Sequence, residues 1–240
     1  MAGAYVAGGR MVAAERGWDW IAAGWALFKK NPGVWIALIV VMLLIYIVLT
    51  LIPLLGSLAS LILGPAFGAG LVAGARAQDE GGALQISHLF AGFREKLGPL
   101  VVVGILYLVA SVAIALVVGL SSGVGLYRMF GGTAPASLPT GTIFTLIIAM
   151  LIMAGLMVPV MMAVWFAPAL VMFQGRDAVV AMKESFFGCL KNIVPFLIYG
   201  VVLMVFSVLA SIPFGLGWLV LGPVLAASAY TSYKDIFTAA

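Results

Sequence analysis

The sequence predicts an all-α integral membrane protein in which six transmembrane helices form three parallel hairpin repeats, with amphipathic interfacial helices on the cytoplasmic side. Of the 240 residues, 65% are hydrophobic and 8% are charged, whereas about a quarter of a soluble globular chain is charged. Uncharged runs long enough to cross a bilayer recur along the chain. A set of Asn, Pro and Gly landmarks also returns near the C-terminus. No polar block could form a soluble domain, so residues 1–240 are expected to be a single membrane domain.

Residues 1–17 are a Gly- and Ala-rich arm without a strong helical period, and the arm is expected to be loose and cytoplasmic. In the next segment, residues 18–31, apolar side chains recur three or four positions apart, as Trp18, Ile21, Trp25 and Phe28. This spacing is typical of an amphipathic helix. Tryptophan beside lysine favours a helix lying in the membrane interface. The helix could simply flank the first crossing, or it could recognise a lipid or a partner.

Residues 31–75 contain no charge. A straight helix of that length, at about 1.5 Å per residue, would be roughly twice as long as the ~30 Å hydrocarbon core is thick. The run must therefore fold back once, and the Pro- and Gly-containing stretch at 52–56 is the expected break. The sequence thus predicts crossings at about 33–52 and 54–75.

A polar segment follows at residues 76–98, with a turn at 79–82. Ser87 is a candidate N-cap for a short interfacial helix in this segment. His88, the one histidine of the chain, is interpreted as a surface residue in water. No second histidine or cysteine lies nearby in the sequence to complete a metal site.

The rest of the chain repeats this alternation. A crossing at 99–120 leads to a Gly-, Ser- and Pro-rich external loop at 121–141, and residues 143–167 are expected to cross back. Charged and apolar residues alternate over 176–191, which predicts a second amphipathic surface helix. Two further crossings are predicted to close the chain, at 193–211 and 213–231.

The first and last hairpins share their landmarks. These return in the same order and at nearly the same separation, pairing Asn31 with Asn192, Pro53 with Pro213 and Pro65 with Pro223. The middle hairpin matches more faintly, with Pro168 in its second crossing. Because each unit would enter from the cytoplasm and return to it, the copies are expected to be parallel repeats about an axis along the membrane normal.

The basic residues predict the orientation. Of the 12 Lys and Arg residues, all but Arg128 fall in the N-terminal part, the two polar segments or the C-terminus. Because cytoplasmic loops are enriched in Lys and Arg, both termini are expected to be cytoplasmic. The chain is therefore expected to cross the membrane several times.

Two groups of short motifs carry a family resemblance. They are the A-M-K-x-S-F run at 181–186, which continues to Lys191 and Asn192, and the G-W-x-W and F-K-K-N-P runs at 17–20 and 28–32. With them the chain resembles a family of small six-helix proteobacterial inner-membrane proteins of unknown function. It is also distantly similar to YciC-like proteins and to the membrane domain of glycerophosphoryl diester phosphodiesterases. The resemblance covers nearly the whole chain and implies a fold but no reaction, since no catalytic phosphodiesterase domain is present.

Three functions from different classes remain open. None of the six predicted crossings contains a charged residue, which disfavours a proton pump or a carrier of charged substrates. The preferred interpretation is a non-enzymatic accessory or scaffold subunit that packs against a larger membrane protein complex. The alternative is a permease or channel for a small neutral or hydrophobic solute. A membrane enzyme acting on lipid ranks third, because the sequence offers no paired carboxylates and no nucleophile with a base.

No cofactor and no nucleic acid partner is expected, because the positive charge is explained by topology and no Gly-rich phosphate loop follows a strand. A methionine stripe could bind Cu(I), but methionine also fills irregular contacts, and packing is preferred; its members are Met150, Met153, Met157 and Met161.

The expected partners are membrane lipids and either another membrane protein or further copies of the chain. The residues predicted to contact lipid or a partner are Arg16, Trp18, Trp25, Lys29, Lys30, Arg94, Lys96, Lys183 and Lys191. Small residues and prolines allow helices to approach closely. Those predicted to pack helices are Gly64, Pro65, Gly68, Gly70, Gly74, Pro168 and Pro223.

Overall fold

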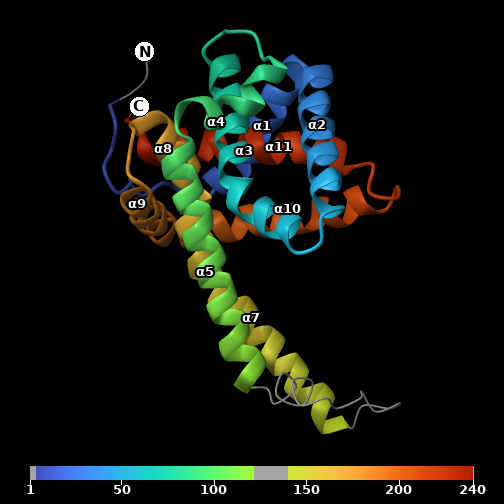
Figure 1. Cartoon of the computed structure of the whole chain (residues 1–240). Coiled ribbons are helices and arrows are strands. Elements are labelled where there is room, and N and C mark those ends of the chain that lie inside the picture. Colours follow the sequence, from blue (N-terminus) through green and yellow to red (C-terminus); the bar gives the residue numbers. More distant parts are fainter. Residues whose placement is uncertain (1–3, 122–139, 240) are drawn as a thin grey trace.

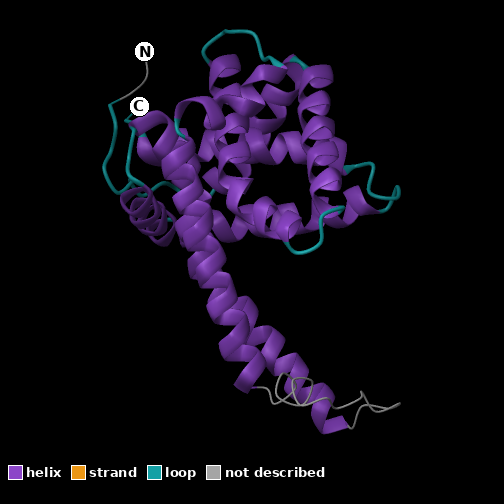
Figure 2. Cartoon of the chain, in the orientation of Figure 1, coloured by secondary structure: helices purple, strands orange, loops and turns teal. Residues whose placement is uncertain are grey.

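The computed structural model describes residues 4–121 and 140–239, which are helical or in loops apart from one isolated antiparallel bridge between Tyr5 and Thr238. Figure 1 shows a body of packed helices from which a long pair, α5 (Leu97–Ser121) and α7 (Thr140–Trp165), projects. Figure 2 shows the loops that join the other helices. The external loop predicted at 121–141 lies outside the described residues, except for its ends, which belong to these two helices.

The first predicted hairpin consists of α2 (Pro32–Thr50) and α3 (Leu55–Asp79). Proline suits the first position of α2, because an N–H there would have no partner within the helix. The chain reverses at residues 51–54, as predicted. The predicted end of the second helix at residue 75 is wrong, since α3 continues to Asp79. No helix breaker intervenes before Gly81, which adopts a φ of 88°.

Helix α3 is the central helix of the body, and half of its most apolar stretch is buried within the molecule. Close packing of α5 on it depends on Gly104, because a Cβ there would collide with the backbone oxygen of Ile62. Pro65 lies inside α3 and is buried. The inserted proline is therefore covered by neighbouring helices rather than by lipid.

The polar segment after α3 forms the 3₁₀ helix η1 (Ile86–Phe90) and the short helix α4 (Ala91–Glu95). The prediction of Ser87 as the N-cap is wrong. Gln85 caps η1 instead, in a reciprocal capping box with His88, whose Nδ1 accepts the Gln85 backbone N–H at 3.0 Å. This pairing satisfies two backbone N–H groups at once. His88 is thus half-buried and part of a cap, rather than a side chain standing free in water.

The crossing predicted at 143–167 breaks at Phe166, and α8 (Ala167–Gln174) follows. Pro168 stands in the first turn of α8, where its missing N–H does no harm. Ser185 provides hydrogen-bond partners for the backbone groups that the break leaves unpaired. Its hydroxyl accepts the Phe166 N–H at 2.9 Å and donates at 2.6 Å to a backbone oxygen in the last turn of α7. A polar side chain of the following surface helix thus holds the bend.

Helices α9 (Ala178–Lys191), α10 (Ile193–Ser211) and α11 (Trp218–Phe237) complete the chain. The bounds of α10 agree with the prediction. The predicted start of the last helix at residue 213 is wrong, because residues 212–217 form a turn in which Phe214 has a φ of 53°.

Among the described helices, five spans are long and apolar enough to cross a membrane, with α7 and α8 counted as one. They are Pro32–Thr50, Leu55–Asp79, Leu97–Ser121, Ile143–Gln174 and Ile193–Ser211. Helix α11 is not among them, because its last turns carry Tyr, Ser, Lys and Asp residues. In the view of Figure 1 it lies across α2 and α3. A sixth crossing and the repeat of parallel hairpins remain predictions.

Helix α1 (Arg16–Lys30) packs along α11, and a Cβ at Gly24 would lie 2.8 Å from the backbone of Ser228. The buried face of α1 includes Trp20, which the predicted apolar stripe omitted. Trp18 and Trp25, which the stripe included, are 52% and 43% exposed. The helix is amphipathic, but its buried face is rotated from the predicted one.

The N-terminal arm is held against the body over its described residues, so the prediction of a loose arm is wrong. The Val6 N–H donates to the Phe237 backbone oxygen and the Arg10 N–H donates to that of Ile236, both at 2.8 Å. These hydrogen bonds pair backbone groups of the arm with backbone groups at the end of α11. The end of α11 therefore orders the arm. The described residues near the two ends of the chain, among them Tyr5 and Thr238, therefore lie side by side (Figure 1).

Candidate functional site

A polar cavity lies where α3, α8, α11 and the N-terminal arm meet, and its volume is about 630 Å³. Its lining residues are Tyr5, Arg76, Asp79, Glu80, Phe173, Gln174, Tyr230, Tyr233, Lys234 and Thr238. The extension of α3 beyond residue 75 creates one wall, since it places Arg76 and Glu80 one helical turn apart. This volume falls in the range of about 300–1,000 Å³ typical of small-molecule sites.

One ion pair joins the two helices that carry the charged residues of the polar cavity, and a second ion pair lies at the end of α3. The Lys234 Nζ donates to Asp79 Oδ2 at 2.6 Å, and the Tyr230 hydroxyl donates to the same oxygen at 3.0 Å. At the C-terminal end of α3, Arg76 Nε donates to Glu80 Oε1 at 2.8 Å. Two cations and two carboxylates thus face one space.

Aromatic rings form the other wall of the polar cavity. The Arg76 guanidinium lies 4.9 Å from the centre of the Phe173 ring, a distance at which the ring face attracts a cation. The centres of Phe173 and Tyr233 are 5.4 Å apart. Gln174 Nε2 donates to the Tyr233 hydroxyl at 2.9 Å. The wall is therefore fixed by both ring packing and a hydrogen bond.

Tyr5 brings the N-terminal arm to the rim of the polar cavity. Its hydroxyl donates to Glu184, and Arg176 lies 4.9 Å from the centre of its ring. Burial and the hydrogen bond to Glu184 raise the pKa of Tyr5 to about 12. The hydroxyl therefore stays protonated and keeps its role as a donor at neutral pH.

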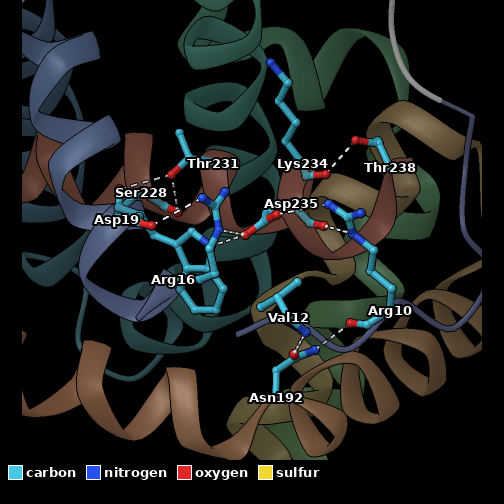
Figure 3. Close-up of polar contacts among 11 residues, drawn as sticks. Arg10, Val12, Arg16, Asp19, Asn192, Ser228, Thr231, Lys234, Asp235 and Thr238 are labelled. Atoms are coloured by element: carbon cyan, nitrogen blue, oxygen red, sulfur yellow. Dashed lines mark hydrogen bonds and ion pairs between the residues drawn. The ribbon is translucent and has the colours of Figure 1, made fainter. Parts of the chain in front are cut away.

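A second polar network fastens the arm and α1 to the last turn of α11 (Figure 3). Asp235 accepts hydrogen bonds from Arg16 Nε at 2.7 Å, Trp20 Nε1 at 2.9 Å and Arg10 Nη2 at 3.2 Å. Burial alone would raise the pKa of Asp235, but the bonds from Arg16 and Trp20 and the two arginine charges hold it below its usual value. Asp235 therefore remains ionised.

Asn192 is the other anchor of the arm (Figure 3). Its Oδ1 accepts the Val12 N–H at 2.8 Å, and its Nδ2 donates to the Arg10 backbone oxygen at 2.9 Å. The same Nδ2 also donates to the Gly188 backbone oxygen at 2.8 Å. The side chain is fully buried. One amide thus satisfies three backbone groups from two segments.

The predicted contact residues are spread over the surface rather than gathered at one place. Seven are exposed, namely Trp18, Trp25, Lys29, Lys30, Arg94, Lys183 and Lys191, and Arg16 and Lys96 are half-buried. Two of the nine bind groups within the molecule. Arg16 pairs with Asp235, and Lys191 Nζ donates to the backbone oxygens of Gly8 and Gly9 at 3.0 and 2.8 Å.

The predicted packing residues lie mostly around α3. A Cβ at Gly70 would collide with the backbone of η1, one at Gly74 would lie 2.8 Å from Leu84, and one at Gly68 would lie 3.8 Å from Pro168. Gly64, Pro65 and Pro168 line a groove of about 320 Å³ between α3, α5, α7 and α8. Pro223 is buried in α11.

The polar cavity escaped the sequence reasoning, which treated its residues as separate flanks of crossings. A usable signal was present, because Tyr233 and Lys234 follow Tyr230 by three and four positions and so lie on the same side of the helix as Tyr230. No cluster of three or more His, Cys, Asp or Glu residues arranged to hold a metal ion occurs in the described parts of the chain. The methionine stripe is partly exposed, with Met150 at 64% and Met161 at 49%.

No family model and no solved structure matches the chain. A relative from Burkholderia thailandensis, named as a probable inner membrane protein, is 32% identical over 226 residues, which cover 91% of this chain and 82% of the relative. The chain belongs to the same family of inner membrane proteins. The similarity to YciC-like proteins and to the phosphodiesterase membrane domain stays a prediction.

Membership of this family agrees with the five apolar spans, and together they support a multi-pass location in the inner membrane. The name of the relative specifies no reaction, substrate or partner.

Proposed function

We propose that this family member is a non-enzymatic accessory or scaffold subunit that packs against a larger membrane protein complex through the hairpin of α5 and α7. The observation that supports this most is the exposure of α7. None of the most apolar stretch of the span Ile143–Gln174 is buried within the molecule, whereas half of that of α3 is. The outer half of the hairpin packs little against the body of the molecule. Its surface is therefore available to contact another membrane protein.

Exposure to lipid alone would not require a partner, so the kind of residue exposed matters. Lipid tails are as apolar as leucine, and helices associate in membranes chiefly where small residues permit close packing. Ala154, Gly155 and Pro159 are exposed on α7. A Cβ added at Gly155 would meet no atom within 4 Å. A helix of a partner protein could approach the α7 backbone closely at this point.

The proposal includes a topology of six crossings, with α11 as the sixth and both termini in the cytoplasm. The contact between Tyr5 and Thr238 supports an even number of crossings, because it requires both ends of the chain to lie on one side. Five crossings would separate them. Three parallel hairpins, each led by a surface helix, are the arrangement proposed for these six.

Photo-cross-linking in the native membrane tests the docking surface. A photoreactive amino acid at Gly155 should give a discrete adduct with one protein, and native mass measurement in lipid discs should show a matching larger particle. The same amino acid at Val201, which is 58% exposed on α10, is the matched control and should give only lipid adducts. Lipid adducts alone at both positions, with a particle of one chain, would exclude the proposal.

The permease is kept as a second candidate because of the groove that Pro65 and Pro168 line. Prolines in two neighbouring membrane helices break backbone hydrogen bonding, as in the discontinuous helices of transporters. A lone particle that conducts a neutral solute in proteoliposomes would favour this candidate. A stable particle with a partner and no flux would favour the subunit.

A further inference from the structure

Three side chains of the polar cavity carry more hydrogen-bond donors than the described residues use. Arg76 uses Nε for Glu80, and among the described residues no hydrogen bond reaches its two Nη groups. Lys234 donates to Asp79, although an ammonium group carries three N–H donors. The Tyr233 hydroxyl accepts a bond from Gln174, which leaves its own proton available. Donors from α3 and α11 thus remain open toward the same space.

The acceptors of the polar cavity are also half used. Asp79 receives both of its bonds on Oδ2, and Glu80 receives its bond on Oε1. Within the described chain, no hydrogen bond reaches Asp79 Oδ1 or Glu80 Oε2. Each carboxylate oxygen can accept about two bonds. The rings of Phe173 and Tyr230 line the same cavity, and aromatic faces attract ammonium groups.

We propose that the polar cavity binds a zwitterionic group made of a phosphate and a primary ammonium, the chemistry of phosphoethanolamine. The phosphate would take the free Nη groups of Arg76 and a donor of Lys234, because guanidinium groups bind phosphate oxygens in a bidentate manner. The ammonium would take the free oxygens of Asp79 and Glu80. The proposal is independent of partner docking by α7.

Charge balance selects this ligand over simpler ones. Arg76 and Lys234 offset Asp79 and Glu80, so the cavity carries no net charge from these four residues. A plain anion would face two carboxylates, and a plain cation would face two basic groups, each at a cost in a partly enclosed site. A ligand carrying both charges can pair with both sets.

The position of the polar cavity makes a lipid headgroup one source of this chemistry. Arg76 stands in the last turns of α3, one of the apolar spans, and headgroups lie at the ends of such helices. A soluble phosphoethanolamine ester is the other source. The two share the same phosphate and ammonium groups, and only a binding experiment separates them.

The test uses the full-length protein in lipid discs. Native mass measurement counts phosphatidylethanolamine retained in mixed discs against phosphatidylglycerol, which lacks the ammonium, and phosphatidylcholine, whose ammonium has no N–H. Calorimetry in phosphatidylglycerol discs then measures binding of glycerophosphoethanolamine. Selective retention of phosphatidylethanolamine assigns the site to the lipid, and binding of the soluble ester without selective retention assigns it to the soluble source. Equal retention of all three lipids with no binding of the ester would overturn the proposal.

Variants link the binding to the polar cavity. Arg76→Gln and Glu80→Gln should each weaken binding about tenfold, because each removes a charge-assisted hydrogen bond. Tyr233→Phe keeps the ring, removes one donor and should weaken it less. Glu95→Gln and Asp177→Asn, at exposed positions outside the cavity, are the controls and should bind like wild type. If all the variants that melt like wild type also bind like wild type, the ligand lies elsewhere and the assignment fails.

Discussion

Arg16 and Asp235 form an ion pair with 2.7 Å between Nε and Oδ2, although 219 positions separate them in the chain. The pair joins the first turn of α1 to the last turn of α11 (Figure 3). Asp235 is 8% exposed, and it also accepts bonds from Arg10 and Trp20. One carboxylate therefore holds the N-terminal arm and α1 against the end of α11.

Asp235→Asn should therefore destabilise the protein. The substitution keeps the shape but removes the charge that three donors share, and a buried polar group left poorly paired costs about 1–3 kcal/mol. The measurement is the midpoint of thermal unfolding in a mild detergent. Asp19→Asn is the matched control, because Asp19 binds Arg16 at 3.2 Å from a side chain that is 46% exposed, and such pairs contribute at most about 1 kcal/mol. Equal midpoints for the two variants would contradict the central role of Asp235.

The same carboxylate predicts a dependence on pH. The folded state holds the pKa of Asp235 below its ordinary value of 3.8, so the ionised form stabilises the fold. That contribution is complete above 3.8 and is lost as the pH falls through the lower, folded-state pKa. The difference in midpoint between wild type and Asp235→Asn should thus be constant from about pH 8 to pH 5 and shrink at lower pH. A difference that instead grows on acidification would show that the sign is wrong.

Hydropathy and helix breakers predicted the five apolar spans found in the described chain, because both signals depend on local sequence. The bounds of α10 agree with the prediction, and the turn at 51–54 falls on Pro53. Termini of helices were predicted less well wherever a distant group decides them. Phe166 ends α7 with the help of Ser185, a residue from the next surface helix, and no local pattern indicates that bond.

The arm and the polar cavity could not be predicted for the same reason. Tyr5 meets Glu184, and Lys234 meets Asp79, so both features arise from pairs that are far apart in the sequence. The composition of residues 1–17 resembles a flexible tail. Its order comes instead from backbone groups that find partners only after α9 and α11 have packed.

Two glycines of the small-residue pattern on α3 should respond differently to the same change. A Cβ at Gly70 would collide with the backbone of Leu89, whereas one at Gly64 would lie 3.8 Å from the Tyr46 hydroxyl. Gly70→Ala should therefore cost about 1–3 kcal/mol, because overpacking forces backbones apart. Gly64→Ala should be neutral or stabilising, because alanine favours helices by about 1 kcal/mol. Unfolding midpoints of both variants decide this, and a loss confined to Gly64→Ala would contradict the packing described here.

Asn31 and Asn192 occupy matching positions of the internal repeat but make different contacts, and this predicts different consequences of their loss. Asn31 accepts one long bond of 3.4 Å from the Val34 N–H, whereas Asn192 satisfies backbone groups of Val12, Arg10 and Gly188. Asn192→Ala leaves these groups without partners, each at a cost of about 1–3 kcal/mol, and should release the arm while the membrane helices stay folded.

Limited trypsin digestion measures that release, since cleavage after Arg10 requires the arm to leave the body. Wild type should resist cleavage at this site, and Asn192→Ala should be cleaved about tenfold faster or more, because the rate follows the population of the open form. Asn31→Ala should be cleaved like wild type, as its single bond belongs to α2. Equal cleavage of all three proteins would mean that Arg16, Asp235 and the bridge at Tyr5 hold the arm without Asn192, and the amide would lose the role assigned to it.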